Sequence, residues 1–118
     1  MDQVDLKESL QSQNPTPETT KPRVIVIGRH DYILDTIGGI LRREGFEPTG
    51  MLETLDDLPK KVLKKPFEVL LLGGGIDPHV RGTLIEAVQN ARPDCHIVEH
   101  FGGPATIISE ISEALKTR

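Results

Sequence analysis

From Pro22 onward, short aliphatic runs alternate with segments whose apolar residues recur at helical spacing, and this alternation occurs four times. Arg23–Ile27 is a β-branched run, and the helical pattern that follows it ends at Gly45, a glycine placed as a C-terminal cap. Phe67–Leu72 holds four consecutive aliphatic residues, which is typical of a strand buried on both faces. Four successive strand–helix units predict an α/β fold with a parallel sheet, right-handed crossovers and helices on both faces.

The second strand–helix unit is the weakest of the four. A short strand is expected at Phe46–Met51 and a short helix at Thr54–Leu63. Proline at the first turn of a helix loses no hydrogen bond, so Pro59 fits this helix if Asp56 is its N-cap.

The third helix has the clearest start signal. Asp77 is placed as its N-cap and Pro78 as its first residue. We expect its inward face to comprise Leu84, Ile85, Val88 and Ala91. The fourth strand is expected at His96–Phe101, and Pro104 starts the last helix.

Gly38 and Gly39 interrupt the first predicted helix, where each glycine costs up to about 1 kcal/mol relative to alanine. Close packing against the sheet is the favoured interpretation of this pair. The alternative is the close approach of a partner helix.

Composition limits the class of protein. The 118 residues suffice for one domain, and we expect residues 1–21, which are poor in apolar side chains, to form a disordered tail before a domain at 22–118. A net charge of −4 without a basic stripe argues against a nucleic-acid partner. The single Cys95, and the lack of a signal peptide or a bilayer-spanning apolar run, predict a cytoplasmic protein with no membrane partner.

Loops that follow parallel strands meet at one edge of a sheet, which is where ligands usually bind in this architecture. Three such loops hold glycines, histidines and acidic residues. The predicted ligand or partner site therefore comprises Gly28, Arg29, His30, Asp31, Gly73, Gly74, Gly75, Asp77, His79, Glu99, His100, Gly102 and Gly103.

Three stretches resemble a known family. RVIVIGRHDYILDTIGGILRREGFEPTG (23–50) resembles the opening of a two-component response-regulator receiver domain. FEVLLLG (67–73) is similar to the third receiver strand, and LIEAVQNARPDCHIVEHF (84–101) is similar to the helix and strand that follow. The resemblance implies a flavodoxin-like parallel sheet of four to five strands and a role in signal transduction.

The chain departs from the receiver pattern at each chemical position. Gly73 stands at the phosphoacceptor position, and Gly28 and Arg29 stand where the family has metal-binding acids. The hydroxyl and lysine of the family are missing, and the chain is one strand–helix unit shorter. The resemblance therefore implies a degenerate receiver that is not an enzyme: a non-phosphorylatable signalling or protein-interaction module. The resemblance implies a protein partner in a signalling pathway. That partner can also be a second copy of this chain, which would give a homodimer.

The strand-end loops also allow other interpretations. The glycines of Gly73–Gly75 can present backbone N–H groups to an anion or small ligand, which is the main alternative function. The pattern Asp77-x-His79-x-x-Gly82 resembles a cobalamin-binding motif but lies in the wrong strand–helix unit. Imidazole and carboxylate groups also suit a divalent metal. None of the histidines or acids has the close spacing of a dedicated ligand pair, so we predict no metal and no cofactor.

Overall fold

The structure is a computed structural model that describes residues 21–100 and 104–116. The predicted tail lies outside the described residues except for Lys21, as do Phe101, Gly102 and Gly103. The elements in chain order are β2 (Arg23–Gly28), α2 (Asp31–Arg43), β3 (Glu47–Leu52), α3 (Leu58–Leu63), β4 (Val69–Gly73), α4 (Pro78–Ala91), β5 (His96–His100), the 3₁₀ turn η2 (Pro104–Thr106) and α5 (Ile107–Lys116).

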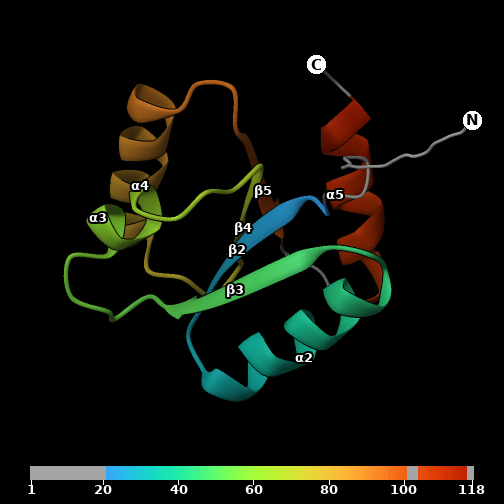
Figure 1. Cartoon of the computed structure of the whole chain (residues 1–118). Coiled ribbons are helices and arrows are strands. Elements are labelled where there is room, and N and C mark those ends of the chain that lie inside the picture. The colour runs from blue at the N-terminus through green and yellow to red at the C-terminus, as the bar shows by residue number, and fades with distance from the viewer. Residues whose placement is uncertain (1–20, 101–103, 117–118) are drawn as a thin grey trace, which may run out of the picture.

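Four parallel strands form one sheet in the order β3-β2-β4-β5. Ile25 lies opposite Thr49 of β3 and Leu70 of β4, so β2 is an interior strand. Helices α3 and α4 cover one face of the sheet, and α2 and α5 cover the other (Figure 1). The predicted α/β architecture with helices on both faces is therefore confirmed.

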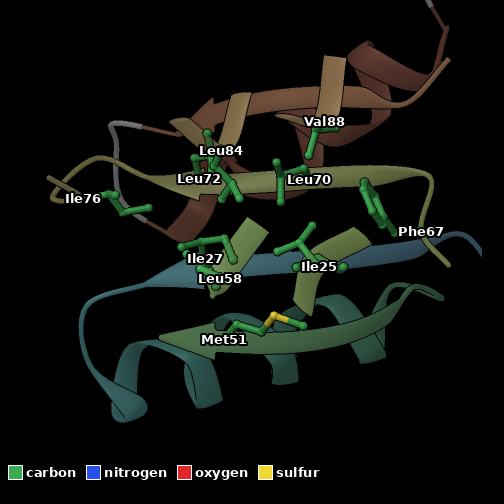
Figure 2. Packing of buried hydrophobic residues seen from close by; sticks show 11 residues of the cluster. Ile25, Ile27, Met51, Leu58, Phe67, Leu70, Leu72, Ile76, Leu84 and Val88 are labelled. Atoms are coloured by element: carbon green, nitrogen blue, oxygen red, sulfur yellow. The ribbon is translucent and has the colours of Figure 1, made fainter. Parts of the chain in front are cut away.

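The two faces bury separate apolar clusters. Successive side chains of a strand point to opposite faces. Leu70 and Leu72 of β4 accordingly pack with α3 and α4, as Figure 2 shows, whereas Val69 and Leu71 pack with α2 and α5. Each of these side chains is at most 1% exposed, and burying one stabilises the fold by roughly 1.5–3 kcal/mol.

Two predicted helix boundaries are confirmed. The Asp77 carboxylate accepts a hydrogen bond from the His79 N–H at 2.8 Å, and Pro78 is the first residue of α4. Gly45, just after α2, has φ = +90°, a conformation that glycine adopts without steric cost.

Two predictions about the helices are wrong. Helix α3 begins at Leu58, and its N-cap is Asp57 rather than Asp56. Asp57 has a left-handed backbone (φ 54°), so the helical conformation cannot extend back through it to Thr54. Ala91 was expected on the inward face of α4 but is exposed. It is the last residue of the helix and lies beyond Leu84 and Val88, the two residues that α4 buries.

The glycine pair in α2 has ordinary surroundings. A Cβ atom on Gly38 would lie 3.6 Å from the nearest side-chain atom, in Arg42, and one on Gly39 would lie 3.9 Å from Arg43. Both are normal van der Waals distances. Close packing among the described residues therefore does not require glycine at either position.

Candidate functional site

A cavity of about 730 Å³ lies at the carboxyl ends of β2 and β4 and continues between α2 and α5. Its surface is more apolar than polar, and its polar side chains come from the predicted strand-end loops and from the first turns of α2. The lining residues are Ile27, Gly28, Arg29, His30, Tyr32, Ile33, Thr36, Ile37, Gly73, Gly74, Gly75, Ile76, His100 and Ile107. The structure thus brings together seven of the predicted site residues in one cavity.

A more polar cleft adjoins this cavity and shares Arg29, Gly75 and Ile76 with it. Asp77 and His79 line this cleft rather than the main cavity. Of the predicted residues that the structure describes, two line neither space. Glu99 is exposed, with its carboxylate 3.7 Å from Arg81 Nε, and Asp31 lies beside a separate, smaller pocket along α2.

An ion pair crosses the polar cleft. Arg29 Nε lies 3.1 Å from Glu53 Oε2, and Glu53 Oε1 accepts a hydrogen bond from the Asp77 N–H at 2.9 Å. The Glu53 side chain is only 11% exposed, so this carboxylate links the loop after β2 to the start of α4. We did not predict Glu53 as a site residue, although it directly follows β3, and the strand-end rule applied to that weak strand would have found it.

His100, which was predicted within the fourth strand and among the strand-end site residues, is the buried last residue of β5. Its Nδ1 lies 2.5 Å from Glu110 Oε1 of α5, and the Thr106 hydroxyl donates to the other Glu110 oxygen at 3.5 Å. The carboxylate favours the tautomer that carries its proton on Nδ1. His100 Nε2 is then the ring atom that can accept a hydrogen bond.

An aromatic pair lines the cavity at the start of α2. The rings of His30 and Tyr32 stack with centroids 5.3 Å apart, and the Tyr32 side chain is highly exposed. The Thr36 hydroxyl, one turn further on, donates to the Tyr32 carbonyl at 2.9 Å. Tyr32 and Thr36 were absent from the predicted site because helical spacing alone does not show which residues of a first turn face a cavity.

Gly73 ends β4 beside the cavity. A Cβ atom placed on it would lie 3.4 Å from the Ile27 carbonyl oxygen, which is ordinary contact. The backbone therefore leaves room for a Cβ atom at this position. Among the described residues, no group of three or more His, Cys, Asp or Glu side chains is arranged to hold a metal ion.

Cys95 lies at the opposite end of the sheet, just before β5. Burial raises the pKa of its half-buried thiol, which lies 3.5 Å from the Phe67 carbonyl oxygen. A raised pKa lowers the thiolate fraction, so the structure gives this thiol no nucleophilic activation.

Comparison with solved structures shows the fold. The chain is similar to the beryllofluoride-activated NtrC4 receiver domain dimer, with a TM-score of 0.55 and 24% identity over 77% of this chain and 76% of that one. It is also similar to a response regulator from Thermotoga maritima, with a TM-score of 0.58 and 14% identity over 79% and 78% of the two chains. No protein-family model and no curated protein matches the chain. The fold, a four-stranded parallel α/β sheet, is therefore receiver-like, in agreement with the sequence resemblance.

None of the helices in the described part of the chain is both long and apolar enough to cross a membrane.

Proposed function

We propose that this chain is a receiver-like signalling module that acts by binding another protein, without phosphorylation and without catalysing a reaction. The observation that carries the proposal is the strand end at Gly73. Phosphoryl transfer to a receiver needs a nucleophilic oxygen there and a metal to neutralise phosphate charge. Glycine offers no nucleophile, although a Cβ atom at this position would make only ordinary contact with the Ile27 carbonyl oxygen.

The neighbouring groups support the same proposal. The Arg29 guanidinium occupies the strand end after β2 and neutralises Glu53, the carboxylate buried beside it. A bound cation at this point would have to compete with a positive charge already in place. Asp77, the other acidic residue that lines the polar cleft, accepts a hydrogen bond from the His79 N–H at its Oδ1 oxygen and so acts as a helix cap.

The outer edge of β5 is the surface that we propose for partner binding. Within residues 21–100 and 104–116, β5 pairs only with β4. The His96 N–H donates to the Glu68 carbonyl before β4, so by alternation the N–H of Glu99 points away from the sheet. An open strand edge can add a strand from another chain, and the similar NtrC4 receiver is described as a dimer.

The phosphorylation part is tested with acetyl phosphate and Mg²⁺, followed by intact mass measurement. We expect no added phosphate on the wild-type chain, while a phosphorylatable receiver treated in parallel gains one. A stoichiometric mass gain on the wild type would refute the proposal, and mapping of the modified residue would identify the acceptor.

The binding part is tested at the edge of β5. We expect Glu99→Pro to weaken self-association or capture of a partner protein, because proline removes the outward N–H and blocks strand addition. Glu99→Ala is the matched control, since it removes the same carboxylate and keeps the N–H. Sedimentation and pull-down that give equal results for both variants would exclude this edge as the binding surface.

A further inference from the structure

We propose that the cavity between α2 and α5 is a binding site for a small organic acid with an apolar body and a hydrogen-bond donor at its far end. The proposal does not depend on the proposed function, since a protein-binding module can exist with or without such a ligand. It rests on the size of the cavity, on its walls and on the polar groups at its two ends.

The size and walls of the cavity suit an apolar ligand body. At about 730 Å³, it falls within the range of roughly 300–1,000 Å³ typical of small-molecule sites. Ile33, Ile37 and Ile107 line it from the two helices. Ile27 and Ile76 border it at the strand ends, although their side chains pack into the apolar cluster on the α3 and α4 face. A ring or short aliphatic body placed there would be removed from water by side chains that are already ordered.

The deep end of the cavity offers a hydrogen-bond acceptor. His100 is only 6% exposed, and its Nδ1 is held by Glu110 at 2.5 Å. The remaining ring nitrogen, Nε2, accepts a hydrogen bond when the imidazole is neutral. A ligand hydroxyl satisfies this acceptor, whereas a carboxylate at the same end would be repelled by Glu110.

The mouth of the cavity carries positive charge. The Arg29 side chain is 58% exposed, and its Nε faces Glu53, which leaves its terminal nitrogens as further donors. Gly74 and Gly75 contribute backbone to the same rim, next to the stacked rings of His30 and Tyr32. Arginine is the side chain best suited to bind a carboxylate, so the acidic group of the ligand is placed at the mouth.

The test uses three related probes: 4-hydroxyphenylacetate, phenylacetate and 4-hydroxyphenylacetamide. Amide and imidazole NMR signals are followed during titration of the full chain. We expect saturable shifts at Gly73–Gly75 and at the His100 ring with 4-hydroxyphenylacetate. Removal of the hydroxyl or replacement of the carboxylate is expected to weaken binding about fivefold, which corresponds to one ordinary hydrogen bond.

Two variants localise the binding. Thr36→Trp fills the cavity from an exposed position of α2, and we expect it to weaken binding at least about tenfold, because the indole would take the space of the ligand body. Arg43→Trp places the same side chain at an exposed position of the same helix outside the cavity and should bind like the wild type. His100→Phe keeps an aromatic ring but removes the Nε2 acceptor. This variant should bind 4-hydroxyphenylacetate only as tightly as the wild type binds phenylacetate.

The proposal is overturned by any of three results. The first is the absence of saturable shifts up to the solubility limit of 4-hydroxyphenylacetate. The second is equal binding by the Thr36→Trp and Arg43→Trp variants, which would place the ligand elsewhere. The third is equal affinity for probes with and without the hydroxyl, which would exclude His100 as the acceptor and with it the proposed ligand class.

Discussion

Replacing Gly39 by alanine should stabilise the isolated protein. Gly39 lies inside α2, where alanine is favoured over glycine by about 0.8–1.0 kcal/mol, because glycine loses more backbone entropy on folding. The new methyl group would lie 3.9 Å from its nearest neighbour, the Arg43 guanidinium, so steric repulsion does not oppose the gain. We expect the free energy of unfolding to rise by nearly the full amount.

Gly45→Ala is the matched control and should have the opposite sign. Its surroundings are open within 4 Å, but its φ of +90° lies in the left-handed region. An L-residue in that region is disfavoured by about 1–2 kcal/mol, so the same glycine-to-alanine change should destabilise the protein.

Thermal and urea unfolding of the two variants measure the difference. A change of about 1 kcal/mol moves Tm by roughly 4–8 °C in a domain of up to about 100 residues, so the variants should lie on opposite sides of the wild type. Loss of stability in Gly39→Ala would refute the reasoning and indicate that this face of α2 is closely covered in the free protein. A stabilised variant that no longer binds its partner would support helix approach at the glycine pair.

Three further outcomes follow from the structure. The hydrogen bond from Arg23 holds the pKa of Glu68 below its ordinary value. The pair therefore stabilises the folded protein at pH values above the pKa that Glu68 has in the unfolded chain, and this stabilisation is lost as the pH falls through the pKa that Glu68 has in the folded protein. Urea unfolding of Glu68→Gln and of the wild type should give free energies of unfolding that differ by at most about 1 kcal/mol at neutral pH, because both side chains are partly exposed. This difference should shrink in acid. Leu70→Ala should cost about 2–5 kcal/mol in the same assay, because Leu70 is fully buried. Glu53→Ala should accelerate hydrogen exchange of the Asp77 amide, and equal exchange rates would contradict the role of Glu53 in holding the start of α4.

Local patterns were sufficient to predict most of the fold. The aliphatic run that ends at Leu72 has no polar side on which water could lie, so it required a strand covered on both faces, as found. Asp77 and Pro78 predicted the start of α4 because capping and the proline ring act within one turn. The start of α3 was missed because the left-handed conformation of Asp57 is locally disfavoured and is held by the surrounding structure, which local sequence patterns do not show.

The candidate site was predicted only in part. The strand-end rule correctly gathered Arg29, His30 and the Gly73–Gly75 loop, since it depends on topology alone. The rule did not predict that His79 lines the polar cleft instead of the main cavity, or that Glu99 lines neither space. Both outcomes depend on the direction in which each side chain leaves the backbone.

The sequence by itself determined the order of strands and helices, the parallel sheet and the absence of a carboxylate at Gly73, because periodicity and residue identity are local properties. Only the tertiary structure decided that Glu53 pairs with Arg29 and that His100 is buried against Glu110. These partners lie 24 and 10 residues apart, respectively, and come together through the packing of whole elements. The free energy of each contact depends on distance and burial, and neither quantity exists until the sheet and its helices have assembled.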